Sequence, residues 1–205
     1  MNIPSSKHVK KSTALKAHTI RLNQNIKSYT LKEIKEHFES ERSSQEIFKE
    51  DLPTPALLLN MDLFEKNLCT MITTLEGTSL KLRPHAKTHK CIEVAQRQIA
   101  SGAIGISTAT LREAEVMATS GIGGLLITSE LVGRNKLGRL IRLTRQQPDT
   151  LTVVDSAAQS DQLNEAAAAS KLTFNVLIDV DPGGRRTGVL PGQPTIQLAE
   201  TIMKS

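Results

Sequence analysis

The sequence has few aromatic residues and few cysteines, and each shortage argues against a class of protein. Of 205 residues none is tryptophan, one is tyrosine and four are phenylalanine, so aromatic side chains make up 2%. Single-stranded nucleic acids bind by stacking their bases on aromatic rings beside cations, so the sequence gives no support for nucleic-acid binding. Two cysteines, Cys69 and Cys91, are too few for a disulfide framework. They are typical of a reducing compartment, and we expect a cytoplasmic protein.

Long apolar runs are also missing, which argues against membrane insertion. No stretch approaches the roughly 18 consecutive apolar residues that a membrane-spanning helix requires, and we therefore expect no membrane partner. The start of the sequence, MNIPSSKHVKKS, has no apolar segment behind its charges. We therefore do not interpret it as a secretory signal.

Acidic residues are absent from the beginning of the sequence. Residues 1–32 hold seven lysines and arginines and no aspartate or glutamate. This composition fits a solvated extension, an arm for nucleic acid or anionic lipid, or a targeting segment. From Tyr29 to Lys49 the charges are mixed and apolar residues recur at helical spacing, which predicts one amphipathic helix. We therefore expect a basic N-terminal extension over residues 1–50 that contains this helix.

Short apolar runs recur along residues 51–205 and predict an α/β domain. They begin at residues 54, 80, 103, 124, 150 and 174, at intervals of 21 to 26 residues. The segments between the runs have helical character, and this alternation is typical of βαβ units and a parallel sheet. Two of the helix starts carry a capping-box pattern, Thr110 with Glu113 and Asp62 with Glu65.

The number and spacing of these units favour a (β/α)8 barrel over a doubly wound sheet. About six βα units can be counted, their spacing is even, and no glycine-rich dinucleotide loop follows the first run. A complete barrel has eight such units, so we expect an incomplete TIM-barrel type of fold over residues 51–205. The edges of its first and last strands would then need a partner.

The most unusual segment is KLRPHAKTHK, residues 81–90, which gathers four cations and two histidines around a proline. In an extended chain Arg83, His85 and Lys87 share one face, which would point into the barrel at its carboxyl mouth, where active sites lie. A lysine amine in water is an inert ammonium, but burial and neighbouring cations favour the neutral amine. A neutral amine can attack a carbonyl and form a Schiff base, which would explain the cluster.

Two other interpretations of this segment stay open. Pro84 would interrupt the ladder of a central strand, which favours a basic surface loop. His85 and His89 could hold a metal ion as an i, i+4 pair, but only if a helix ran through the residues just after Pro84.

These segments resemble the D-threonine aldolase and D-serine dehydratase family. The stretches that carry the resemblance are TPALLLNMDLFEKNL, KLRPHAKTHKC and ISTATLREAEVMATSGI, and the similarity extends from residue 52 to about residue 203. Family members have an alanine-racemase-type barrel (fold type III) that binds pyridoxal 5′-phosphate (PLP). The resemblance implies that Lys87 is the catalytic residue and holds PLP as a Schiff base. It also implies a cofactor-binding place for His85 and a solvent-facing position for Lys90 at a helix start.

A second motif, DVDPGGRRTGV over residues 179–189, follows the sixth apolar run. On its own it reads as a strand-to-helix turn, with the amides of the Gly-Gly pair available as a small anion nest. The family carries an Asp-x-Gly-x-x-Arg-x-Gly pattern here, and Asp181, Gly183, Arg186 and Gly188 match it. The resemblance implies that Arg186 contacts the cofactor's phenolic oxygen or the substrate carboxylate, and that Asp181 belongs to the same cofactor site.

The chemistry that the resemblance implies is that of a PLP-dependent lyase acting on β-hydroxy D-amino acids. An aldolase cleaves the Cα–Cβ bond, whereas a dehydratase expels the β-hydroxyl and yields ammonia and a keto acid. Family members use a divalent metal whose ligands lie in a C-terminal β-domain, and they form homodimers. That domain has no counterpart in this sequence, so we assign no metal ligand and expect a truncated member. The alternative is a catalytically inactive barrel remnant that binds PLP weakly or serves as an interaction module.

Overall fold

The computed structural model describes residues 47–204 and, before them, Thr30, Lys32, Glu33 and Glu36. The amphipathic helix predicted between Tyr29 and Lys49 therefore lies for the most part outside the described residues.

The chain divides into two compact units, residues 1–67 and 68–205, and the boundary falls within helix α2 (Met61–Leu75). Before α2, the described part of the first unit contains one short 3-10 turn, η1 (Lys49–Asp51). Within the described residues, no helix is long and apolar enough to span a membrane.

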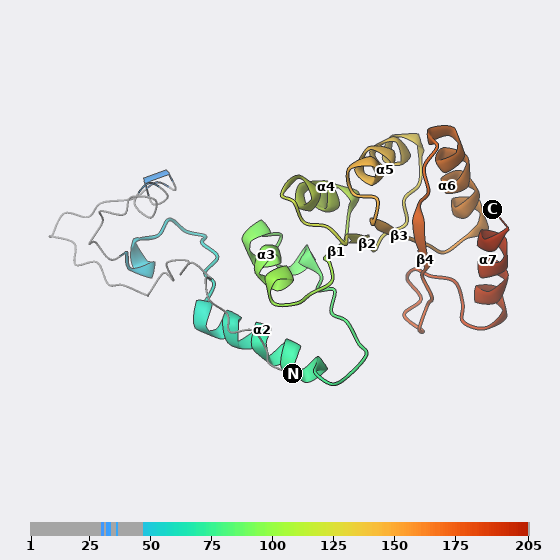
Figure 1. Ribbon diagram of the computed structural model, residues 1–205. Coiled ribbons are helices and arrows are strands. Elements are labelled where there is room, and N and C mark those ends of the chain that lie inside the picture. The colour runs from blue at the N-terminus through green and yellow to red at the C-terminus, as the bar shows by residue number, and fades with distance from the viewer. Residues whose placement is uncertain (1–29, 31, 34–35, 37–46, 205) are drawn as a thin grey trace, which may run out of the picture. The chain divides into compact units, whose positions relative to one another are not determined.

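The second unit is built around a four-stranded parallel sheet whose strands follow one another in chain order. The strands are β1 (Ser107–Thr108), β2 (Leu126–Ile127), β3 (Leu151–Val154) and β4 (Asn175–Ile178). The helices of this unit are α3 (Ile92–Ala100), α4 (Leu111–Thr119), α5 (Arg134–Gln146), α6 (Ala157–Ser170) and α7 (Gln193–Met203). Figure 1 shows β1 to β4 in a row, with α4 and α5 on one side of it. The predicted α/β fold with a parallel sheet is confirmed.

The strand predicted over residues 80–87 forms only in part. It runs parallel to β1, where Ile104 N donates to Leu82 O at 2.9 Å and Ser107 N donates to Pro84 O at 2.8 Å. His85 and Ser107 form a single bridge pair. Pro84 has no N–H group to donate, so a regular ladder cannot continue through it.

The strand predicted over residues 54–60 is wrong, because this segment pairs with no other part of the described chain. Its leucines are exposed, and Leu57 has 95% of its surface open to solvent. A strand exists only where a neighbour completes its backbone hydrogen bonds. An apolar pattern such as TPALLLN therefore predicts a strand only when that neighbour is present.

One predicted helix start is confirmed and the other is displaced. At α4, Glu113 N donates to Thr110 Oγ1 at 3.2 Å, while the Glu113 carboxylate accepts from Ala109 N at 2.7 Å. The first bond satisfies an amide that the helix itself leaves unpaired, and the second ties the residue before the N-cap to the first turn. The box predicted at Asp62 is wrong, because Asn60 caps α2 by accepting the amide three residues later at 2.9 Å.

The core lies between the sheet and the helices that cover one of its faces. The register places Ile127, Thr152 and Val176 side by side, and Val154 beside Ile178. The largest fully buried apolar side chains are Ile106, Met117, Leu125, Ile127, Leu140 and Val154. The opposite face is less covered, since the side chain of Leu177 in β4 is 44% exposed. This face is the one that a closed barrel would turn inward.

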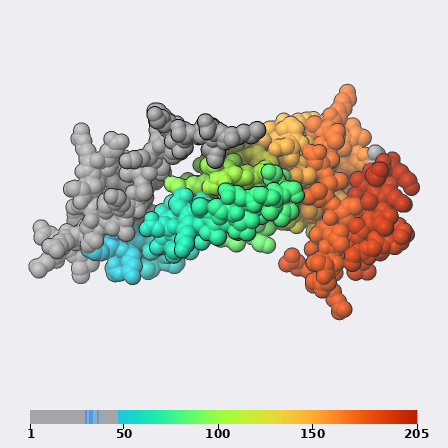
Figure 2. Space-filling model, turned by 60° about the horizontal axis from the view of Figure 1, so that its bottom comes forward, coloured from blue at the N-terminus to red at the C-terminus, as the bar shows by residue number. Residues whose placement is uncertain are grey.

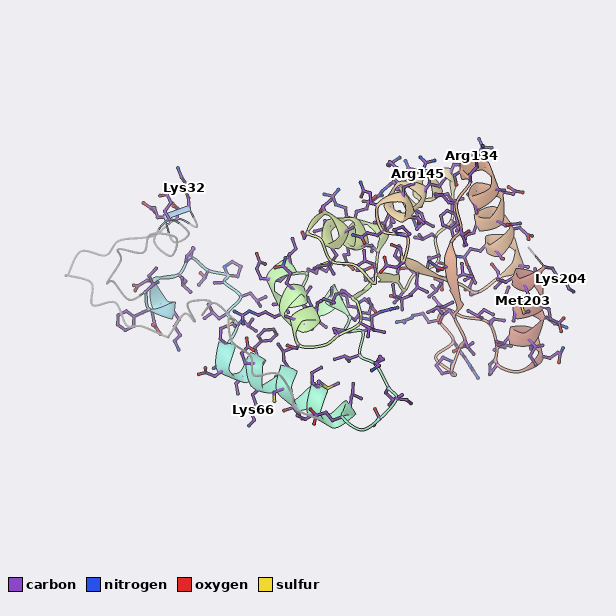
Figure 3. All side chains as sticks on the ribbon, in the orientation of Figure 1. Lys32, Lys66, Arg134, Arg145, Met203 and Lys204 are labelled. Carbon is purple, nitrogen blue, oxygen red and sulfur yellow. The ribbon has the colours of Figure 1, made fainter. Side chains whose placement is uncertain are left out.

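Helix α5 shows how the outer layer is attached. It buries Leu137, Leu140 and Leu143 against the core. The Arg139 guanidinium contacts α4, where its Nε lies 2.9 Å from Glu115 Oε1. The arginines at the ends of the same helix point outward (Figure 3).

Two glycines set how closely the backbone passes at the amino ends of β1 and β2. A methyl group on Gly105 would lie 1.9 Å from the carbonyl oxygen of Gly124, which is far inside the contact distance. Figures 1 and 2 show that residues 80–100 and residues 175–203 lie at opposite ends of this unit. The close passage at Gly105 therefore lies near the end that carries the first motif.

The Gly105→Ala variant tests this close approach. We expect the free energy of unfolding, measured by urea denaturation, to fall by about 3 kcal/mol, because the backbone must shift to admit the methyl group. Gly138→Ala is the matched control, since a methyl group on Gly138 in α5 would meet no atom of the described chain within 4 Å. That change should raise the free energy of unfolding by about 0.5–1 kcal/mol. Equal effects of the two substitutions would contradict the packing described.

Candidate functional site

Both sequence motifs lie at the carboxyl edge of the parallel sheet. Strands of a parallel sheet all end at the same edge, where ligands bind in α/β folds. Lys87 follows the segment that pairs with β1, and residues 181–188 follow β4. The first motif therefore stands at one end of the row of strands and the second at the other end (Figure 1).

The chain turns sharply as soon as it passes His85. Residues Ala86–Thr88 form the 3-10 turn η2, and Ala86 is fully buried. The Ala86 carbonyl accepts two amides, from His89 at 3.1 Å and from Lys90 at 2.7 Å. The buried methyl group of Ala86 and its carbonyl, which accepts two hydrogen bonds, anchor this turn. The side chain of Lys87, the next residue, is exposed.

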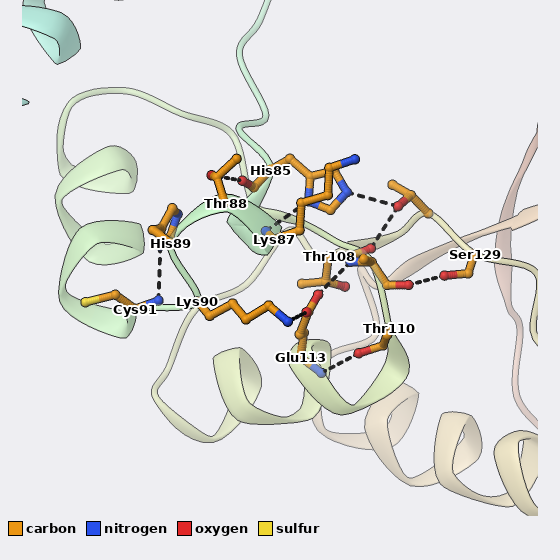
Figure 4. Close-up of polar contacts among 12 residues, drawn as sticks. His85, Lys87, Thr88, His89, Lys90, Cys91, Thr108, Thr110, Glu113 and Ser129 are labelled. Atoms are coloured by element: carbon orange, nitrogen blue, oxygen red, sulfur yellow. Dashed lines mark hydrogen bonds and ion pairs between the residues drawn. The ribbon is translucent and has the colours of Figure 1, made fainter. Parts of the chain in front are cut away.

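The Lys87 side chain is exposed, which contradicts the expectation of a dry amine. The alternation of faces that would bury it holds only while the chain is extended. The chain leaves the extended conformation after His85, so this alternation no longer buries the Lys87 side chain, whose cation stays close enough to His85 to lower the pKa of that ring. The described chain therefore offers Lys87 as an accessible amine at the edge of the sheet (Figure 4).

His85 is the most highly connected side chain of the motif. Its Nδ1 lies 3.2 Å from the amide nitrogen of Lys87, and its Nε2 lies 3.1 Å from Thr128 Oγ1. The Thr128 hydroxyl in turn donates to Thr108 O at 3.0 Å. Burial and the neighbouring Lys87 cation lower the pKa of His85 below its usual 6.5, and Glu113 opposes them. The lowered pKa favours the neutral form of the ring at pH 7.

Lys90 precedes α3 and its side chain is 66% exposed, as the resemblance implied, but it also makes an ion pair. Its backbone is left-handed, with φ of 49°, and its Nζ lies 3.2 Å from Glu113 Oε1. Burial would raise the pKa of Glu113, but the Ala109 amide and the Lys90 ammonium outweigh it, so this pKa lies below the usual 4.5. The ion pair joins the Lys87 turn to the first turn of α4 (Figure 4).

The second motif is a closed loop organised by Asp181. This carboxylate is 7% exposed and accepts Gly183 N at 2.9 Å and Arg185 N at 3.0 Å. The loop is closed at its base by Val189 N donating to Asp179 O at 2.9 Å. Asp181 is thus engaged with the backbone of its own loop.

The anion nest suggested by the sequence is filled by the loop itself. The Gly183 amide points at the Asp181 carboxylate. Gly188 is required in this loop, because its φ is 95° and a methyl group there would lie 2.6 Å from Asp181 N. Arg186 follows the part of the loop that Asp181 holds, and its side chain is exposed.

Sequence reasoning missed a group of carboxylates at the same edge. Glu130, Asp155 and Asp179 follow the ends of β2, β3 and β4. Burial raises the pKa of Glu130, and the charges of Asp155 and Asp179 raise it further. The signal that could have found them is that Asp155 and Asp179 come directly after strand ends, in VVDS and LIDV.

The metal interpretation of the two histidines is wrong in its geometry. Residues 86–88 form a single 3-10 turn, and His89 Nδ1 accepts the amide of Cys91 at 3.1 Å. Across the part of the chain that the structure describes, no group of three or more His, Cys, Asp or Glu side chains is arranged to hold a metal ion.

Comparison with known proteins identifies a family and several relatives. Residues 59–205 match the family described as alanine racemase, N-terminal domain. The chain is similar to the D-threonine aldolase of Arthrobacter sp., with 37% identity over 147 residues that cover 72% of this chain and 38% of that protein. It is also similar to the D-threo-3-hydroxyaspartate dehydratase of Delftia sp. (strain HT23), with 33% identity over 138 residues, 67% of this chain and 36% of that protein.

A solved structure shows the same similarity in three dimensions. The crystal structure of D-threonine aldolase from Filomicrobium marinum matches with a TM-score of 0.73 and 41% identity, over 77% of this chain and 42% of that chain. The chain thus spans less than half the length of the relatives it matches. The predicted fold class, an incomplete barrel of the alanine racemase type, is confirmed.

The Asp181→Ala variant tests whether this carboxylate builds the loop. Removing it leaves the amides of Gly183 and Arg185 without an acceptor, which costs about 1–3 kcal/mol. We expect hydrogen exchange at both amides, measured by NMR, to become about tenfold faster. Asp161→Ala, on the exposed surface of α6, is the control and should leave both rates unchanged. Unchanged rates in Asp181→Ala would show that the loop is held by other contacts.

The Glu113→Gln variant tests the link between the Lys87 turn and α4. The pKa of Glu113 is lowered in the folded protein, so this carboxylate stabilises the fold above about pH 4.5 and stops doing so as the pH falls through the lowered value. We expect the variant to be about 1 kcal/mol less stable than the parent at pH 7. This difference, measured by urea denaturation, should shrink toward zero in acid. A difference that stays constant from pH 7 to acid would rule out the ionised network.

Proposed function

Because this chain belongs to the family of the alanine racemase N-terminal domain, we propose that it binds PLP through Lys87 and acts as a lyase on β-hydroxy D-amino acids. Support for the substrate class comes from the relatives. D-Threonine and D-threo-3-hydroxyaspartate, named in their descriptions, are both β-hydroxy D-amino acids. D-Threonine aldolase and the dehydratase break different bonds, and the proposal covers both reactions.

The observation that carries the proposal is the position of Lys87. Its turn follows the segment paired with β1 and stands at the carboxyl edge of the sheet, where barrels bind their ligands. Lys87 is accessible there and would hold the cofactor through its side-chain nitrogen. When bound, the cofactor supplies an electron sink for the bond broken at Cα of the substrate.

The other site residues divide into two roles. Arg186 is an exposed guanidinium at the same edge and suits an acceptor oxygen of the cofactor or the substrate carboxylate. Asp181 holds the backbone of the loop that carries Arg186, and we propose that it serves the site in this way. The divalent metal and the homodimer stay predictions from the resemblance.

A second candidate follows from the exposure of the Lys87 amine. An amine in contact with water gains no reactivity from a dry environment. The chain would then bind PLP without turning over a substrate, or would serve as an interaction module. Enzyme assays with D-threonine and D-serine separate the two candidates. Formation of glycine and an aldehyde, or of ammonia and a keto acid, supports the lyase.

Borohydride reduction in the presence of PLP tests the attachment residue. Reduction makes the bond between amine and cofactor permanent, so mass mapping of the peptides locates it. We expect the cofactor mass on the peptide that contains Lys87, and its loss in Lys87→Ala. The Lys90→Ala variant is the control and should keep the label. Labelling that is spread over the surface lysines, or unchanged in Lys87→Ala, would refute the proposal.

A further inference from the structure

We infer that Thr128 is a positioning residue, whose hydroxyl holds His85 in the one neutral tautomer that can fix the backbone of Lys87. This inference rests on the proposed function, because it explains how the reactive lysine is oriented. Thr128 lies just after β2, outside both sequence motifs. Its hydroxyl joins a chain of hydrogen bonds that connects the Lys87 amide and the His85 ring to the Thr108 carbonyl.

The direction of the chain follows from what each atom can donate. The Lys87 amide can only donate, so the Nδ1 atom of His85, 3.2 Å away, accepts and carries no hydrogen. A neutral imidazole has one N–H group, which must then be on Nε2. Nε2 therefore donates to Thr128 Oγ1 across 3.1 Å. The single hydroxyl hydrogen of Thr128 is used on Thr108 O, 3.0 Å away, so its oxygen is free to accept.

Thr128 is held firmly enough to select the tautomer. Its amide nitrogen donates to the same Thr108 carbonyl at 2.9 Å, so both its backbone and its hydroxyl are bound to the end of β1. A carbonyl oxygen has two lone pairs and accepts both bonds. The hydroxyl hydrogen is therefore oriented toward Thr108 O, and one of the oxygen's two lone pairs is available to the His85 ring.

Burial and the Lys87 cation also favour the neutral ring, and the Glu113 carboxylate opposes them. From η2, Lys87 lowers the pKa of His85, as burial does, while Glu113 of α4 raises it less strongly. A second proton on the ring would sit on Nδ1, where it would face the Lys87 N–H group and break the contact. The neutral ring therefore links three neighbouring parts of the sheet edge: the Lys87 turn, the end of β1 and the residue after β2.

The consequence for the site is a fixed exit direction for the Lys87 side chain. The side chain itself is exposed, so its orientation depends on its backbone. The turn η2 has only three residues, and the contact from His85 Nδ1 is a side-chain cap on it. Loss of this cap would let the turn open and the amine sample more directions, which slows any reaction that needs one alignment.

Thr128→Val tests the inference, because valine has the same shape without the hydroxyl. We expect long-range ¹H–¹⁵N NMR of the cofactor-free chain at pH 7 to show hydrogen on Nε2 of His85 in the parent. In Thr128→Val we expect a mixture of tautomers, and hydrogen exchange at the Lys87 amide that is about 3- to 10-fold faster. Thr128→Ser, which restores the hydroxyl, should return both readouts to the parent values.

Thr144→Val is the matched control, because Thr144 is buried and its hydroxyl has no hydrogen-bond partner among the residues that the structure describes. It should change neither the tautomer nor the Lys87 amide. The rate of Lys87 labelling by PLP and borohydride should fall about 3- to 10-fold in Thr128→Val and not in Thr144→Val. Hydrogen on Nδ1 in the parent, or a Thr128→Val protein with unchanged tautomer and amide exchange, would overturn the inference.

These readouts also separate the inference from the proposed function. The tautomer and the amide exchange are measured without cofactor, so they stand if PLP does not attach to Lys87. Failure of labelling in the parent chain refutes the proposed function alone. Normal labelling of the parent with an unchanged rate in Thr128→Val refutes the positioning role alone.

Discussion

The site depends on the parallel pairing of residues 82–85 with the start of β1. Two backbone hydrogen bonds, from Ile104 to Leu82 and from Ser107 to Pro84, fix where that segment ends. They bring His85 level with Ser107 and place the following turn at the carboxyl edge of the sheet. Without this pairing the basic segment would be an ordinary surface loop, and the chain of bonds through Thr128 would have no fixed partner.

Most of the framework could be predicted from the sequence, because buried parallel strands are continuous apolar runs. The run at residues 150–156 contains β3, and the run at residues 174–180 contains β4. The exposure of Lys87 could not be predicted, because alternation ends where two amides bind the Ala86 carbonyl. The Lys90 ion pair depends on a left-handed backbone, which a lysine does not suggest.

The edge of the sheet combines two kinds of charge in separate places. The basic segment with Lys87 lies beside β1, while three carboxylates follow β2, β3 and β4. The basic segment beside β1 attracts an anionic phosphate, and the three carboxylates repel it. The loop of Asp181 satisfies its own amides, so it presents Arg186 rather than an empty anion nest.

We propose that PLP joins Lys87 and no other lysine. A crystal structure of the chain grown with PLP would decide this. We predict continuous electron density from Lys87 Nζ to the aldehyde carbon of the cofactor, with His85 still within hydrogen-bond distance of Thr128. Density that joins the cofactor to Lys90 or Lys81, or a bare Lys87 beside a bound cofactor, would contradict it.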